Sequence, residues 1–225
     1  MRAAADRLGD GALTVAGLLP GASNGTLLGS IEGVAVVYKP IAGEAPLWDF
    51  PDGTLAAREV AAYRLADALG WPAVPPTVLR DGPMGPGAVQ LFVEHDPREH
   101  FFTLRDRRLA ELRSVAAFDV VANNADRKGG HVLVDAGGTL WAIDHGLCFH
   151  AEPKLRTVIW EFAGEPVPED LCEDLRRVAG ELPGVLDDLL DPAELEAAAD
   201  GAQRLAETGR FPEPGPDRAV PWPPV

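Results

Sequence analysis

The amino-acid sequence predicts an α+β fold in which strands come first and helices later. β-rich runs separated by turns occupy much of the first hundred residues, and apolar periodicity predicts helices at 54–70, at 103–122 and beyond 169. Because strands and helices do not alternate, a doubly wound parallel sheet is not expected. We expect one domain of two lobes, with an N-terminal lobe over residues 1–95 and a C-terminal lobe over 96–225.

The N-terminal lobe is expected to be mostly strand and turn. Strands are predicted at 12–19, 26–31 and 34–39, and Glu32-Gly33 is placed to form a tight hairpin turn between the last two. The helix at 54–70 has Gly70 just past its end, where a left-handed residue often terminates a helix. Two short strands, 77–79 and 88–93, are predicted around a Gly/Pro-rich turn at 82–87.

The C-terminal lobe is expected to be helical around one embedded hairpin. After the helix at 103–122, two apolar runs at 132–134 and 140–143 are joined by a turn-rich link at 135–139. Helices are then predicted at 169–181, 184–190 and 192–207. The Pro-rich segment after residue 210 is expected to be irregular.

Composition excludes several classes of protein. The 225 residues carry a net charge of −15, which opposes binding to nucleic acid and to anionic membranes. The sequence has no apolar run long enough to span a membrane. With only two cysteines, a disulfide framework is not expected, and a reducing cytoplasm is the simplest location.

Two aspartates flank the predicted hairpin. Asp126 lies in the loop before its first strand and Asp144 follows its second strand, so closure of the hairpin should bring them together. His131, five residues after Asp126, is a third candidate ligand. Paired carboxylates of this kind can hold Mg²⁺ and face a nucleophile.

A possible phosphate-binding pair lies upstream. Lys39 ends an apolar strand, and Glu59 lies 20 residues later in the predicted helix. A strand lysine held by a helix glutamate is typical of nucleotide-phosphate binding. The small polar loop with Ser23, Asn24 and Gly25 could offer backbone N–H groups to phosphate.

Together, the two aspartate motifs resemble a known enzyme family. Asp126-Arg127-Lys128-Gly129-Gly130-His131 and Asp144-His145-Gly146 resemble the loop and metal motifs of the phosphatidylinositol 3-/4-kinase-like branch of the protein-kinase fold. The chain is similar to a small uncharacterised actinobacterial family in that branch. The resemblance covers about residues 20–175.

The resemblance implies a small two-lobed kinase-like fold with ATP between the lobes. It implies that Asp126 acts on the acceptor hydroxyl, with Lys128 beside the γ-phosphate, and that Asp144 binds the metal. The remaining implied contacts with ATP are Ser23, Asn24 and Gly25 over the phosphates, Lys39 paired with Glu59, and Phe92, Val93 and Glu94 at the adenine. His131 replaces the metal-binding Asn of the family, and three consequences are open: weaker binding of Mg²⁺, a preference for Mn²⁺, or no role of His131 as a ligand.

The predicted function is transfer of the γ-phosphoryl group of ATP to an unidentified small-molecule or protein hydroxyl. Two alternatives remain open, a nucleotide-binding pseudokinase or interaction module with a degraded metal site and a kinase-fold nucleotidyl transferase. A hydrolase-type His/Asp metal site involving His145 and His150 is a further possibility. Each candidate side chain also has a purely structural interpretation, as a turn, cap or surface charge.

Overall fold

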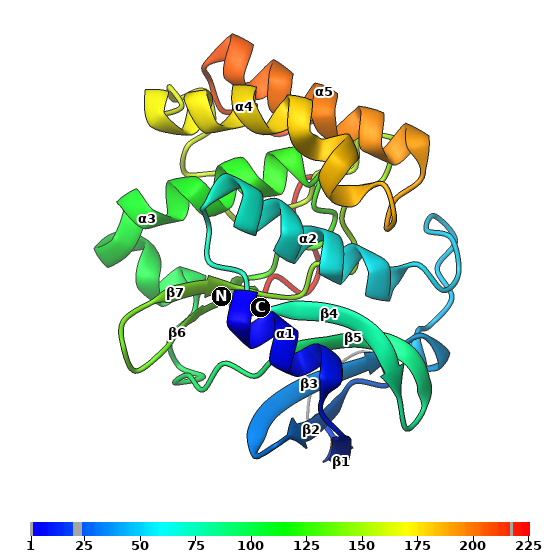
Figure 1. The fold of residues 1–225 in the computed structure, drawn as a ribbon. Coiled ribbons are helices and arrows are strands. Elements are labelled where there is room, and N and C mark those ends of the chain that lie inside the picture. Colours follow the sequence, from blue (N-terminus) through cyan, green and yellow to red (C-terminus); the bar gives the residue numbers. More distant parts are fainter. Residues whose placement is uncertain (1, 20–23, 217) are drawn as a thin grey trace.

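The computed structural model describes residues 2–19, 24–216 and 218–225. In this part of the chain a five-stranded antiparallel sheet and a two-stranded ribbon are combined with five α-helices (Figure 1). The elements are α1 Arg2–Asp10, β1 Leu13–Leu18, β2 Leu27–Ile31, β3 Val34–Pro40, α2 Leu55–Leu69, β4 Thr77–Gly82, β5 Gly85–Leu91, α3 Phe101–Val121, β6 Val132–Val134, β7 Leu140–Ala142, α4 Glu169–Leu186 and α5 Pro192–Thr208. The predicted α+β class is confirmed.

The large sheet has the strand order β1-β2-β3-β5-β4. The turn between β2 and β3 is the predicted one, and both of its central residues have positive φ, 49° at Glu32 and 82° at Gly33. This geometry matches the right-handed twist of the two strands that it joins. Strand β3 lies in the middle of the sheet, because it pairs with β2 on one side and with β5 on the other.

The β4–β5 hairpin is tighter than expected. Instead of a turn over 82–87, the strands extend until Gly82 pairs with Gly85. The ring of Tyr38 on β3 lies against this end of the hairpin, and its hydroxyl donates a hydrogen bond to the Gly85 carbonyl. A Cβ atom at Gly82 would lie 2.7 Å from Cζ of Tyr38, so packing of this ring requires glycine there.

Helix α2 lies between the sheet and the outer helices (Figure 1). Ala56 and Val60 pack with Ala88 of β5, whereas other α2 residues join the large core built with α3, α4 and α5. The buried Arg58 pairs with Glu194 of α5 and donates a 2.7 Å hydrogen bond to the Cys148 carbonyl. Because α2 is buried on nearly all sides, it is rich in small alanine residues.

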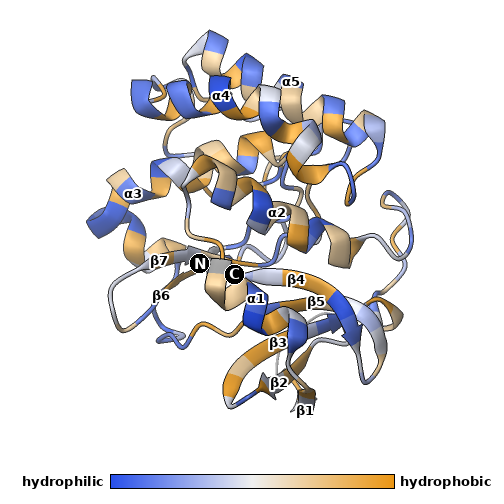
Figure 2. Cartoon of the chain, in the orientation of Figure 1, coloured by the Kyte–Doolittle hydropathy of each residue, from blue (hydrophilic) through white to orange (hydrophobic). Residues whose placement is uncertain are grey.

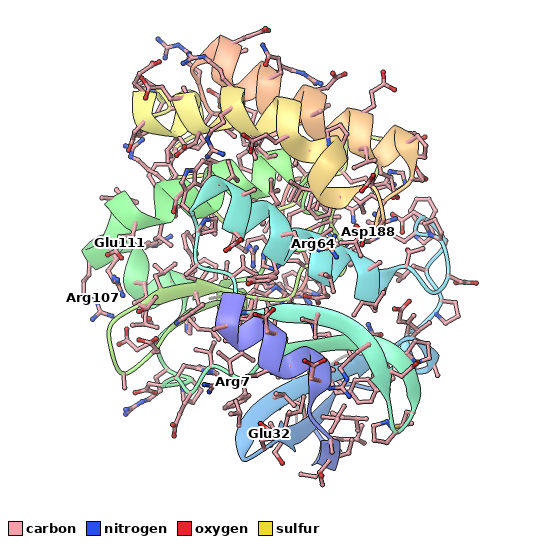
Figure 3. All side chains as sticks on the ribbon, viewed as in Figure 1. Arg7, Glu32, Arg64, Arg107, Glu111 and Asp188 are labelled. Carbon is pink, nitrogen blue, oxygen red and sulfur yellow. The ribbon has the colours of Figure 1, made fainter. Side chains whose placement is uncertain are left out.

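The outer layer consists of α4 and α5, which pack against each other and against α2 and α3. Blue and orange residues alternate along both outer helices in Figure 2, as expected of helices with one face in the core. Figure 3 shows Arg64 of α2 beside Asp188, just after α4. Arg64 Nη2 donates to Asp188 Oδ2 at 3.0 Å and Nη1 to the Val185 carbonyl at 3.1 Å, which ties α2 to the end of α4.

Helix α1 was not predicted, because the first fifty residues were expected to be strand and turn. Ala3, Ala4 and Ala5 favour a helix, but Leu8 is the one fully buried side chain among its described residues, too little to give an apolar period. Leu8 packs on the core of the sheet. Arg80 of β4 donates hydrogen bonds to the carbonyls of Leu8 and Gly11, which caps the end of the helix.

The predicted break between helices at 181 and 184 is also wrong. A single helix, α4, runs through Pro183 to Leu186. Leu182 and Leu186 are fully buried in the large core and keep the last turns helical despite the proline. The segment after α5 has no helix or strand in its described residues, as expected.

The division into lobes near residue 95 stays a prediction, since α2 packs with the later helices as well as with the sheet. Among the described residues no helix has the length and apolarity needed to cross a membrane.

The burial of Leu8 gives a test of the N-terminal helix. Leu8→Ala should lower the free energy of unfolding by about 2–4 kcal/mol, because it leaves a cavity on the core of the sheet. Asp6→Ala, an exposed change in the same helix, should alter it by less than about 0.5 kcal/mol. Urea denaturation measures both, and equal values for the two variants would show that α1 does not pack as described.

Candidate active site

Lys39 lies on β3 and points toward α2. Its Nζ forms an ion pair with Glu59 of α2 and a 2.9 Å ion pair with Oδ1 of Asp144, which follows β7. Glu59 is 2% exposed. Burial opposes the charge on Lys39, but the Asp144 and Glu59 carboxylates outweigh it and raise the pKa of Lys39 above its ordinary value. The lysine is therefore a fixed positive charge.

Asp144 projects from a left-handed backbone position, with φ of 60°. Its Oδ1 is paired with Lys39, and its Oδ2 lies 3.2 Å from Nε2 of His131. Lys39 lowers the pKa of Asp144 far below its ordinary value, against the effect of burial. The carboxylate is thus ionised, and both of its oxygens have partners within the protein.

Asp126 lies in the loop between α3 and β6. Its N–H donates a 3.0 Å hydrogen bond to Oδ1 of Asn124, and its Oδ2 lies 3.3 Å from Nζ of Lys128. Burial raises the pKa of Asp126, and the neighbouring Lys128 partly offsets this. A half-buried carboxylate with a raised pKa is suited to accept a proton.

His131 is linked to the same loop. Its Nδ1 accepts a 3.4 Å hydrogen bond from the Lys128 N–H, so the ring proton is on Nε2 and points at Asp144. Burial lowers the pKa of His131 to about 4, so the ring is neutral near pH 7. In this tautomer Nε2 is a hydrogen-bond donor, and binding a metal through it would require the proton to move to Nδ1.

A buried polar network supports both aspartate loops, and the sequence did not predict it. The guanidinium of Arg127 pairs with Asp119 of α3 at 3.0 Å and donates to Nε2 of His145 at 2.7 Å. Asp119 also accepts hydrogen bonds from Asn124 and Thr157. All five side chains are buried. One signal was available, since Asp119 stands among apolar residues of a predicted helix.

Most of the predicted site residues line one cavity of about 510 Å³. Lys39, Glu59, Asp126, His131 and Asp144 are on its walls together with Asn24 and Gly25. Its apolar walls include Leu19, Val37 and Ile143. The structure thus brings Asp126, Asp144 and Lys39 together around a space large enough for a small-molecule ligand.

The loop expected over the phosphates is hydrogen-bonded to the segment that follows β3 in the same chain. Gly25 N–H donates a 3.0 Å hydrogen bond to the Gly43 carbonyl, so it is not free for a phosphate. Asn24 Oδ1 accepts one from the Ala45 N–H at 3.2 Å. The backbones are so close that a Cβ atom at Gly25 would lie 3.1 Å from Cα of Gly43. Ser23 lies outside the described residues.

The residues expected at the adenine are not on the cavity walls. Phe92 N–H donates to the Ala35 carbonyl at 3.0 Å, and the Val93 carbonyl lies 2.8 Å from Nδ1 of His95. Neither they nor Glu94 line the cavity, whereas Gln90 of β5 does. A role of Phe92, Val93 and Glu94 in binding adenine stays a prediction.

Residues 44–53, between β3 and α2, form a flap beside the cavity. Glu44 accepts hydrogen bonds from the first N–H groups of α2, at 2.9 Å from Ala56, which stabilises the start of that helix. Asp49 Oδ2 lies 3.3 Å from Nζ of Lys154, and the Lys154 ammonium lies over the Trp48 ring. The flap is thereby joined to the segment after β7.

Comparison with known proteins identifies the family. The family model described as "Phosphatidylinositol 3- and 4-kinase" matches residues 78–188. Protein Rv2133c of Mycobacterium tuberculosis is 40% identical, over 96% of this chain and 93% of its own length. The chain belongs to the phosphatidylinositol 3-/4-kinase-like family. The resemblance predicted from the two aspartate motifs is therefore confirmed.

More distant relatives agree with this kinase-like assignment. Phosphatidylinositol 4-kinase gamma 4 of Oryza sativa is 34% identical over 51% of this chain and 24% of its own length. The Helicobacter pylori proinflammatory kinase CtkA has a TM-score of 0.56 at 11% identity and covers 91% of this chain and 94% of its own. Golgi casein kinase has a TM-score of 0.51 at 13% identity, over 94% and 78% of the two chains. These structures confirm the predicted kinase-like fold.

The buried network of this kinase-like chain gives a stability prediction. Asp119→Asn keeps the shape of the side chain but leaves the Arg127 guanidinium buried without a counter-charge, which should cost about 3–5 kcal/mol of folding free energy. Asp106→Asn, on the same helix but with a 90% exposed side chain, should cost less than about 0.5 kcal/mol. Chemical denaturation compares the two variants. A small effect of Asp119→Asn would contradict the conclusion that this network supports the two aspartate loops.

The lowered pKa of His131 predicts a pH dependence of stability. His131 binds a proton near pH 6.5 in the unfolded chain and only near pH 4 in the folded chain. The contribution of this neutral ring to the free energy of unfolding is therefore present above pH 6.5 and is lost as the pH falls. Between pH 8 and pH 5 the loss should be about 2 kcal/mol. His131→Gln should lose correspondingly less over this range in urea titrations. Parallel pH profiles for the two proteins would contradict the expected protonation difference.

Proposed function

We propose that the chain is an ATP-dependent phosphotransferase that moves the γ-phosphoryl group to a hydroxyl acceptor. The observation that carries this proposal is the cluster of Lys39, Glu59 and Asp144 in a cavity that also holds Asp126. A fixed cation, an ionised metal-binding carboxylate and a proton acceptor are the groups that phosphoryl transfer needs.

In this proposal Lys39 binds the α- and β-phosphates. A triphosphate approaching a chain of net charge −15 needs local positive charge, and Lys39 supplies it from a position fixed by Glu59. The apolar side chains of Leu19, Val37 and Ile143 offer surfaces for the base. ATP binding would release one oxygen of Asp144 from Lys39.

The carboxylates fit a metal that arrives with the nucleotide. The described residues contain no group of three or more His, Cys, Asp or Glu side chains arranged to hold an ion. Mg²⁺, however, is usually held by one or two carboxylates together with substrate phosphates and water. Asp144, with Asp126 nearby, would hold Mg²⁺ or Mn²⁺ in this way, and the metal would neutralise charge on the phosphates.

Asp126 would orient the acceptor hydroxyl and take its proton. Its raised pKa and its position on the cavity suit this role. Lys128, beside it, would offset charge on the transferred phosphoryl group. The acceptor is a small molecule or a protein, and the acidic chain disfavours a headgroup in an anionic membrane. The two free, buried cysteines agree with the cytoplasmic location that we propose.

One observation favours a second candidate, a nucleotide-binding pseudokinase. Both oxygens of Asp144 have protein partners, Lys39 and His131, so metal must compete with two existing contacts. Titration with Mg²⁺ and Mn²⁺ separates the candidates, because a pseudokinase would bind ATP equally with and without metal. A nucleotidyl transferase would transfer label from α-labelled rather than γ-labelled ATP.

Substitution of the two aspartates tests the proposed roles. Asp126→Asn should lower ATP turnover by about 10²–10⁴-fold and leave nucleotide affinity nearly unchanged, because the carboxylate acts on the acceptor. Asp144→Ala should instead abolish metal-dependent nucleotide binding. Calorimetry and release of labelled phosphate measure the two properties. Full turnover by Asp126→Asn would remove this residue from the mechanism.

A further inference from the structure

The segment after residue 217 docks beside the candidate active site. The Ala219 carbonyl accepts hydrogen bonds from the Thr157 N–H at 3.0 Å and from the Trp160 indole at 3.1 Å. Five residues later, the Pro224 carbonyl accepts a 2.7 Å hydrogen bond from the Gly129 N–H. Pro221, between these two anchors, is buried. Figure 1 shows this red C-terminal segment passing behind α2 and α3.

Both anchors lie next to Asp126. Gly129 follows it by three residues, so their Cα atoms are at most about 11 Å apart. On the other side, residues 156–158 pair with Arg127, the residue after Asp126, through hydrogen bonds of 3.0 and 3.1 Å. The docked segment therefore crosses from residues 156–158, which pair with Arg127, to the loop that carries Asp126.

An extended peptide that offers a hydroxyl to Asp126 could take backbone partners at the same place. Peptides commonly dock by adding their main chain to free N–H and C=O groups of a protein. Here the N–H groups of Gly129 and Thr157 and the indole of Trp160 are already donated to the chain itself. A peptide could use them only by displacing residues 218–225.

The docked segment cannot itself be the acceptor. Residues 209–225 contain no Ser, Thr or Tyr, so they offer no hydroxyl for phosphorylation. Three of the docked residues, Pro221, Pro223 and Pro224, are prolines, which favour an extended backbone and lose little entropy on docking. The segment is thus suited to remain bound beside Asp126 without being modified.

We propose that residues 218–225 occupy the peptide-docking side of the active site and restrict the acceptor to small molecules. This inference rests on the proposed phosphotransferase function and narrows its substrate class. The cavity itself, lined by other elements, remains open to ATP and to a small hydroxyl compound.

The test compares variants of the full chain in which the segment is or is not released. Pro221→Glu places a charge at a buried position and should undock it, whereas Pro214→Glu changes an exposed proline of the same tail. Trp160→Phe removes one donor to Ala219 without adding charge. Hydrogen–deuterium exchange of peptides containing Gly129 and Thr157 should be protected in wild type and Pro214→Glu, and at least 10-fold faster in Pro221→Glu.

The activity arm uses γ-labelled ATP with a random pool of serine-containing peptides, and ATP hydrolysis to water as the reference reaction. We expect Pro221→Glu to label the pool at least 10-fold more than wild type, Trp160→Phe to lie between them, and Pro214→Glu to match wild type. Unprotected amides in wild type, unchanged exchange in Pro221→Glu, or equal peptide labelling by wild type and Pro221→Glu despite faster exchange would each overturn the inference. Absence of ATP binding and hydrolysis in wild type would instead count against the proposed function.

Discussion

The geometry of the candidate site depends on the buried ion pair between Arg127 and Asp119. Both side chains are fully buried, so each charge needs the other. The planar guanidinium has donors left over, and they reach His145 and the Ile143 carbonyl on the far side of the β6–β7 ribbon. A single side chain therefore fixes the loop before the ribbon relative to the segment after it. The separation of the two aspartates follows from this link.

Helix α2 couples the part of the molecule that carries these two loops to the sheet. Glu59 pairs with Lys39 of β3, while Arg58, one residue earlier, pairs with Glu194 of α5. Since neighbouring residues of one helix hold the sheet and the outer helices, a shift of α2 would strain both contacts. Packing of small alanines on both sides of α2 leaves little room for such a shift. The ion pair between Lys39 and Glu59 is thus held in one arrangement.

Local patterns made much of this architecture predictable. Turn chemistry at Glu32-Gly33 and Gly70 places the β2–β3 hairpin and the end of α2, and the ribbon that brings Asp126 toward Asp144 follows from short apolar runs around a Gly-rich link. Contacts between distant segments were not predictable in the same way. The hydrogen bond between Gly25 and Gly43 and the network around Arg127 join residues that are far apart in the sequence. The local pattern of apolar and polar residues does not indicate that such residues lie close together.

The distribution of lysine in the chain has a practical consequence. The sequence contains three lysines, and the structure places Lys39 on the cavity wall, Lys128 beside Asp126 and Lys154 on the contact with the flap. Every lysine side chain thus contacts a candidate site residue or the flap beside the cavity, while the other cationic side chains are arginines. Amine-directed acylating reagents would therefore report on this region almost alone, and their reactivity at each lysine would provide a readout of ligand occupancy without any engineered label.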